Sequence, residues 1–125
     1  MTLPYQYVVL RCVPRVDREE FVNVGVVLYC QAAGFLAASC HVDDQRLHSL
    51  APDVDLDAVR HGLAFVEGVA RGDEGIGAAA AGDLGTRFGF LKAPRSTVVQ
   101  PGPVHGGLTE DPGAELVRLL DVLVR

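Results

Sequence analysis

Hydrophobic residues gather in three runs in the first third of the chain, at residues 5–13, 21–30 and 35–42. Each run is rich in β-branched and aromatic residues, which is typical of strands. Pro14 ends the first run, because proline has no N–H to donate to a sheet. Residues 31–34 make a tight connection between the second and third runs, so the three runs predict an antiparallel β-meander.

The second strand, residues 21–30, has a distinctive alternation. Its even positions are all apolar, which predicts a face buried in a core, whereas its odd positions include Asn23 and Gly25. Gly25 leaves room for a side chain, a ligand or a backbone, and a packing contact is the preferred interpretation. A hairpin loop of even length places Ser39 and His41 on the side of the even positions, and an odd loop places them on the other side. The sequence leaves both registers open.

After residue 42 the apolar spacing becomes helical. Asp43 and Asp44 are suited to cap a short helix that ends before Pro52. A longer helix follows from about residue 55 and stops at Gly72, because glycine is favoured where a helix ends in a left-handed conformation. The apolar face of this longer helix consists of Leu56, Val59, Leu63, Val66 and Ala70.

The remaining chain predicts one more strand and a final helix. Residues 72–86 are dominated by glycine and alanine and predict a flexible surface loop, residues 87–91 a single helical turn, and residues 96–100 a fourth strand. Asp111 as N-cap and Pro112 at the first helical position begin a last helix. The order β-β-β-α-α-β-α predicts one α+β domain over residues 1–125. Its antiparallel sheet, a three-stranded meander plus a later fourth strand, is covered on one face by helices.

Composition narrows the classes of function. The formal net charge of -5 disfavours broad binding to nucleic acid, which requires a basic excess. The three cysteines form no CxxC pair and lie in apolar runs, so they indicate buried thiols. Because no apolar stretch has membrane length and no leader is evident, we expect a cytoplasmic protein that does not insert into membranes.

Two polar clusters are candidates for chemistry. Residues 15–20 contain both arginines and carboxylates. The arginines, Arg18 among them, are suited to bind an anion, and Glu20 is suited to act as a general base. The preferred interpretation is an exposed connection with weak ion pairs. His41, His48 and the aspartates between them match no known metal spacing, and the aspartates are explained as helix caps. We therefore predict neither a metal nor a cofactor.

A third candidate lies between residues 87 and 105. Guanidinium, hydroxyl, amide and imidazole groups in this segment suit the recognition of a phosphate or a peptide. These groups belong to Arg87, Arg95, Ser96, Gln100 and His105. Ser96 lacks the glycine-flanked turn that presents a nucleophile, so acyl transfer is disfavoured and no catalytic residue is predicted. The preferred interpretation, however, is that these polar residues form strand ends and turns, because polar residues beside prolines commonly do so.

Two segments resemble a bacterial family called domain of unknown function 3037. Residues 7–11 and 18–28 carry the first part, which contains the specific block Glu-Phe-Val-Asn-Val-Gly-Val-Val-Leu at residues 20–28. Residues 87–91, 94–96 and 108–112 carry the second, which reads Arg-Phe-Gly-Phe-Leu, Pro-Arg-Ser and Leu-Thr-Glu-Asp-Pro. The resemblance implies an intracellular bacterial protein, but no reaction. It also implies a partner or regulator of a HipA-like kinase, because genes of such families often neighbour genes of that kinase.

Three functions remain as hypotheses. The first is a non-catalytic binding or regulatory module that acts on another protein, with a HipA-like kinase as the implied partner. The second is a small enzyme or ligand-binding protein that recognises a phosphate-bearing molecule through an arginine-rich pocket. The third is a homodimer formed through sheet edges or the last helix. The candidate ligand-binding residues are Arg11, Arg18, Glu20, Asn23, Arg87, Arg95, Ser96, Gln100 and His105.

Overall fold

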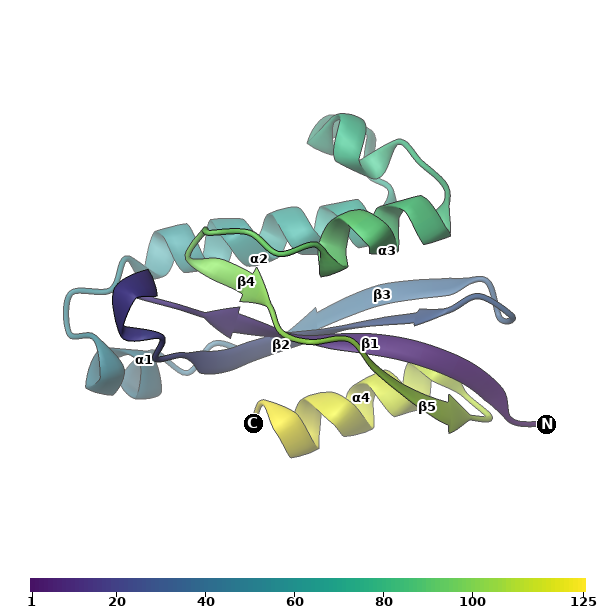
Figure 1. The fold of residues 1–125 in the computed structure, drawn as a ribbon, viewed down its shortest axis with the longest axis horizontal. Coiled ribbons are helices and arrows are strands. Elements are labelled where there is room, and N and C mark those ends of the chain that lie inside the picture. The colour runs from purple at the N-terminus through teal and green to yellow at the C-terminus, as the bar shows by residue number, and fades with distance from the viewer.

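In the computed structural model, which describes residues 1–125, the three predicted strands are β1 (Leu3–Cys12), β2 (Val22–Cys30) and β3 (Phe35–Cys40). They form the expected antiparallel meander, and the α+β class is confirmed (Figure 1). The loop between β2 and β3 has four residues, since Cys30 lies opposite Phe35. An even loop puts Ser39 opposite Val26, which selects the first of the two registers that the sequence left open.

The sheet has five strands rather than four. β4 (Val99–Pro101) and β5 (His105–Thr109) both pair antiparallel with β1, along the edge that β2 leaves free. β4 is shorter than the strand predicted at residues 96–100, and it extends into Pro101. β5 was not predicted, because Gly106 and Gly107 give its sequence little strand propensity.

A β-bulge interrupts the pairing of β1 with β2. Leu10 lies opposite Gly25, but the next residue, Arg11, lies opposite Asn23, so Val24 is an extra residue on β2. The bulge reverses the alternation of side chains along β2. The prediction of one continuous even face is therefore wrong. Even residues before and after the bulge pack into two different cores, Val22 and Val24 into one and Val26, Leu28 and Cys30 into the other.

Four α-helices complete the fold: α1 (Asp44–Leu50), α2 (Leu56–Arg71), α3 (Leu84–Lys92) and α4 (Pro112–Leu123). Each begins after an aspartate whose side chain accepts a hydrogen bond from a backbone N–H three residues later. These caps are Asp43, Asp55, Asp83 and Asp111. α2 stops at Gly72, which has a φ of 76° as a helix-ending glycine requires. None of the helices has the length and apolar character needed to cross a bilayer.

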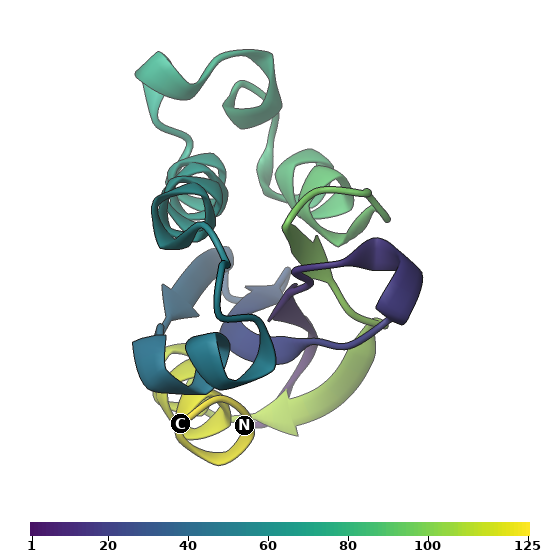
Figure 2. The same cartoon turned by 90° about the vertical axis from the view of Figure 1, so that its left-hand side faces the viewer.

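Helices cover both faces of the sheet, and not one as expected. α2 and α3 lie on one face and α4 on the other (Figures 1 and 2). The reason is that β1 is apolar on both sides. Its residues Val8 and Leu10 pack into the core under α2 and α3, whereas Tyr5 packs against α4. A sheet with two apolar faces needs a layer on each of them.

The glycine- and alanine-rich segment joins α2 to α3. It contains two short 3-10 helices, η2 (Glu74–Ile76) and η3 (Ala78–Ala80), which project beyond α2 and α3 away from the sheet (Figure 1). Ile76 packs on α2 where Gly68 has no side chain, since a Cβ at Gly68 would lie 2.5 Å from the Ile76 Cδ1. α3 starts at Leu84, capped by Asp83, and is longer than the single turn predicted at residues 87–91.

Candidate functional site

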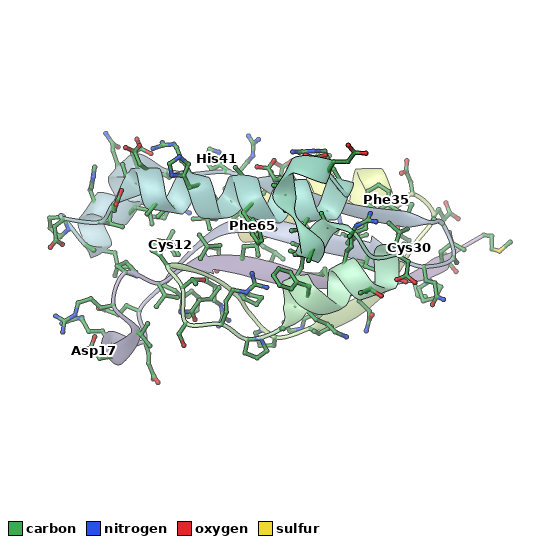
Figure 3. The ribbon with its side chains drawn as sticks, turned by 90° about the horizontal axis from the view of Figure 1, so that it is seen from above. Cys12, Asp17, Cys30, Phe35, His41 and Phe65 are labelled. Carbon is green, nitrogen blue, oxygen red and sulfur yellow. The ribbon has the colours of Figure 1, made fainter.

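The connection between β1 and β2 meets the segment that leads into β4. It contains a 3-10 turn, η1 (Val16–Arg18), and Figure 3 shows its Asp17 beyond the end of the sheet. The two segments are joined by a hydrogen bond of 2.7 Å from the Val13 N–H to the Val98 carbonyl oxygen. A concavity of about 410 Å³ lies here. We call it the Arg11 cleft, and its lining residues are Arg11, Val13, Val16, Glu19, Phe21 and Gln100.

The guanidinium of Arg11 is held by residues that adjoin the two neighbouring strands. Its central carbon lies 4.0 Å from the centroid of the Phe21 ring, directly before β2. From the other side of β1, Gly102 contacts the same group, and a Cβ there would lie 3.1 Å from the Arg11 Cζ and Nε. A planar guanidinium stacks well on an aromatic ring, and the missing side chain of Gly102 leaves the necessary room. Arg11 is therefore positioned before any ligand arrives.

Arg11 differs from every other arginine of the chain because its guanidinium has no hydrogen-bond or ion-pair partner. The other arginines each bond to a carboxylate or to a carbonyl oxygen. The Nε of Arg11 is buried without a partner, whereas Nη1 and Nη2 remain open to solvent. The four N–H groups of Nη1 and Nη2 have no acceptor within the chain, and donors of this kind in a cleft are chemically suited to an anion.

Of the predicted site residues, Gln100 lies with Arg11, because the two are direct partners in the pairing of β1 with β4. The Gln100 side-chain amide donates to the Thr97 carbonyl oxygen at 2.9 Å. Arg18 and Glu20 form an exposed ion pair with each other on the same connection. The hydrogen bond from Arg18 lowers the pKa of the Glu20 carboxyl, which makes Glu20 a poor general base at neutral pH.

The other predicted residues lie elsewhere. Arg87 donates to the Gly82 and Ala70 carbonyl oxygens, and Arg95 donates to that of Phe90 while its guanidinium lies 4.8 Å from the Phe90 ring. Arg87 and Arg95 line two further concavities, each distinct from the Arg11 cleft. The cationic residues of the phosphate hypothesis thus do not share one pocket.

Three more predicted residues serve structure or face solvent. Asn23 donates to the Leu123 carbonyl oxygen at the end of α4, 3.0 Å away. The ring of His105 packs beside that of Tyr7, with centroids 5.3 Å apart, and Ser96 is exposed. None of the three lines the Arg11 cleft.

Nucleophilic and metal chemistry find no support in the arrangement of side chains. No three histidine, cysteine or acidic side chains gather where they would hold a metal ion. All cysteines are free thiols, and Figure 3 shows Cys12 and Cys30 well apart in the sheet. Burial raises the pKa of the Cys40 thiol to about 12 and also raises that of Cys12. Both thiols are therefore protonated, and unreactive, near neutral pH.

Sequence reasoning missed Phe21, Val16 and Gly102 as parts of the site. Phe21 is 44% exposed and Val16 is 55% exposed. The sequence carries no signal for them, because it does not show which apolar residues beside a charged connection are exposed. Their contact with Arg11 was not predictable, since it depends on β1 lying between β2 and β4.

Comparison with known proteins gives one match. A family model described as "Protein of unknown function (DUF3037)" matches residues 7–124, which confirms the resemblance drawn from the sequence motifs. No curated protein and no solved structure matches the chain.

Proposed function

The chain belongs to the DUF3037 family of proteins of unknown function, and we propose that it is a non-catalytic module that binds a partner protein at the Arg11 cleft. The observation that carries this proposal is the unpaired guanidinium of Arg11. The buried Nε–H has lost water without gaining a partner, so the contacts that hold the guanidinium in place come at a cost. The donors on Nη1 and Nη2 are bonded to no group of the chain, so they are available to an acceptor that a partner brings.

The exposed Nη1 and Nη2 atoms define how the acceptor approaches. Because Nε is buried, a ligand reaches the end of the guanidinium rather than its side. Two parallel N–H groups at that end match the two oxygens of a carboxylate. The surrounding Val13, Val16 and Phe21 are apolar, which strengthens such a pair by reducing its exposure to water. An aspartate, a glutamate or a terminal carboxylate of the partner fits this site.

The state of the other reactive groups supports binding rather than catalysis. The Glu20 carboxylate is paired with Arg18. The Cys12 and Cys40 thiols have raised pKa values and stay protonated. A phosphate-binding enzyme would need several converging cations, and of the arginines in that hypothesis only Arg11 makes no hydrogen bond to another group of the chain.

A HipA-like kinase is the partner that the family resemblance suggests, and the first experiment uses it. The chain and a HipA-like kinase from the same organism are expressed together, and their dissociation constant is measured by titration of the purified proteins. We expect association at micromolar concentrations, and Arg11→Gln should weaken it by about tenfold to a hundredfold, or about 1.4–2.8 kcal/mol.

The matched control is Arg125→Gln, which removes an exposed arginine paired with Asp121. This variant should bind like the unaltered chain, because exposed ion pairs contribute little. Failure of the unaltered chain to associate at micromolar concentrations contradicts the kinase as partner. Equal loss in both variants contradicts the role of the Arg11 cleft.

A further inference from the structure

Glu19 is the one residue other than glycine that has a positive φ, at 57°. It ends the η1 turn, where its N–H donates to the Val16 carbonyl oxygen. The turn requires a left-handed residue at this position, and glycine or asparagine adopts that conformation more readily than glutamate. The turn itself therefore does not explain why a glutamate stands here, and such outliers often mark functional sites.

The carboxylate of Glu19 is also without a partner. The acidic residues on either side of it are engaged, Asp17 with Arg15 and Glu20 with Arg18. Glu19 lines the Arg11 cleft, yet no hydrogen bond or ion pair joins it to Arg11. The cleft thus holds one positive and one negative side chain that form no ion pair with each other.

The same cleft exposes apolar surface from Val16 and Phe21. It therefore offers a cation, an anion and an apolar contact within one concavity of about 410 Å³. A purely acidic ligand would meet repulsion from Glu19, and a purely basic ligand would meet repulsion from Arg11. A ligand that carries both charges satisfies both groups at once.

We infer that the Arg11 cleft recognises a protein segment in which an acidic and a basic side chain flank an apolar one. Arg11 receives the carboxylate, Glu19 receives the cation, and Val16 and Phe21 contact the apolar side chain. This inference rests on the proposed function, and it adds the charge pattern of the segment that the partner presents. Glu19 sets specificity through that pattern, because it favours a mixed-charge segment over an acidic one.

The test uses three peptides that are acetylated and amidated at their ends, with the same glycine and serine flanks. Their central residues are Asp-Leu-Lys, Asp-Leu-Gln and Asn-Leu-Lys. Binding to the full chain is followed by NMR, through the Arg11 side-chain Nε–H and the backbone amides of Glu19 and Phe21. We expect the Asp-Leu-Lys peptide to bind at least about threefold more tightly than either of the others.

Glu19→Asn is the decisive variant, because asparagine keeps the left-handed turn and removes the charge. It should melt at the same temperature as the unaltered chain or higher, and it should bind the Asp-Leu-Lys and Asp-Leu-Gln peptides equally. Glu110→Gln, which changes an exposed carboxylate outside the cleft, should keep the preference.

The outcomes separate the two proposals. If the unaltered chain binds the Asp-Leu-Lys and Asp-Leu-Gln peptides equally through Arg11, the role of Glu19 is refuted while carboxylate binding stands. If both aspartate peptides leave the Arg11 signal unmoved at millimolar concentration, both proposals are refuted. If Glu19→Asn retains the preference for Asp-Leu-Lys, another group binds the lysine of the peptide and the inference is refuted.

Discussion

Asn23 and Leu123 lie one hundred residues apart in the sequence, yet the Asn23 side-chain amide donates a hydrogen bond to the Leu123 carbonyl oxygen, 3.0 Å away. The bond satisfies one of the carbonyls that every helix leaves free at its end. It also ties the bulged part of β2 to the end of α4.

Loss of this bond should destabilise the fold. Asn23→Ala should lower the free energy of unfolding by about 1 kcal/mol. Asn23→Asp should lower it further, because a negative charge then faces the negative end of the α4 dipole. Urea denaturation monitored by circular dichroism measures both changes, and an unaltered midpoint in both variants would show that the bond contributes nothing.

The contact of β1 with α4 at Glu115 should make stability depend on pH. Arg118 and Tyr5 both donate hydrogen bonds to the Glu115 carboxylate. Bonding to Arg118, followed by bonding to Tyr5, lowers the pKa of Glu115 to about 2. Since the pKa is lower in the folded chain than in the unfolded one, this stabilisation is complete above about pH 5 and is lost as the pH falls towards 2.

Glu115→Gln isolates this contribution. Near neutral pH the variant should be less stable than the unaltered chain by about 1.5–3 kcal/mol, the usual value for hydrogen bonds to a charged group. The difference between the two proteins should shrink as the pH falls through the acid range. Urea titrations at a series of pH values measure it, and a difference that stays constant with pH would rule out the carboxylate as its source.

Gly25 should not tolerate a side chain. A Cβ at this position would lie 3.0 Å from the Cys40 Sγ and 3.1 Å from the Leu10 Cδ1 and the Ser39 carbonyl oxygen. Gly25→Ala should therefore cost about 1–3 kcal/mol through overpacking. Removing the thiol with Cys40→Ala in the same chain should restore part of this loss, and a double-mutant cycle measures the coupling.

Gly106→Ala is the control for Gly25→Ala, because it places the same side chain in a strand that has room for it. The nearest atom to a Cβ at Gly106 is the Tyr5 carbonyl oxygen, 3.5 Å away. Its stability should change by less than about 0.5 kcal/mol. Equal losses in both variants would mean that the cost arises from the glycine backbone and not from crowding at the bulge.

Gly102→Ala tests whether the position of Arg11 matters for binding. The new Cβ would meet the Arg11 Nε and Cζ at 3.1 Å, and the guanidinium, as the far end of a flexible side chain, would move aside. We expect an unchanged melting temperature and about tenfold weaker binding of an aspartate peptide, or about 1.4 kcal/mol. Unchanged affinity would indicate that Arg11 finds its ligand from any orientation.

Arg87 should stabilise the segment between α2 and α3. Its two hydrogen bonds reach the carbonyl oxygens of Gly82, near the end of that segment, and of Ala70, in the last turn of α2. Arg87→Met should lower the free energy of unfolding by about 1.5–3 kcal/mol and speed hydrogen exchange at residues 72–83. Arg71→Met, which removes an exposed pair with Asp73, should change stability by less than about 1 kcal/mol.

The elements that could be predicted from the sequence are those with strong local signals. Residues of the first three strands and of α4 have a regular apolar spacing, and the structure places strands and a helix there. The sequence of β5 has no regular apolar spacing. This strand forms because it pairs with β1, where Gly107 lies opposite Tyr5. A Cβ at Gly107 would lie 2.6 Å from the Tyr5 Oη, so only glycine fits.

The bulge and the site depend on contacts that are distant in sequence. Gly25 predicted a close contact with a neighbouring group. The reversal of the side-chain alternation of β2 at Val24, however, appears only when β1 and β2 are paired. Arg11 and Gln100 could be named as candidates from their chemistry. Arg87 and Arg95 bind carbonyl oxygens near the ends of α2 and α3, and sequence spacing does not determine to the residue where a helix ends. That Arg11 has no such acceptor is visible only once β1 lies between β2 and β4.

The position of β1 in the middle of the sheet constrains the order in which the protein folds. The ribosome makes β1 before any other strand, and β2 and β3 can pair with it early. Its second edge, however, takes its partners from residues 99–109, close to the end of the chain. Until they emerge, the nascent sheet has an open edge, and its Tyr5 and Leu28 face remains without α4. Translation that stalls between β3 and β4 would therefore leave a partial sheet with an unpaired edge and an exposed apolar face, which is prone to aggregate and is a substrate for chaperones.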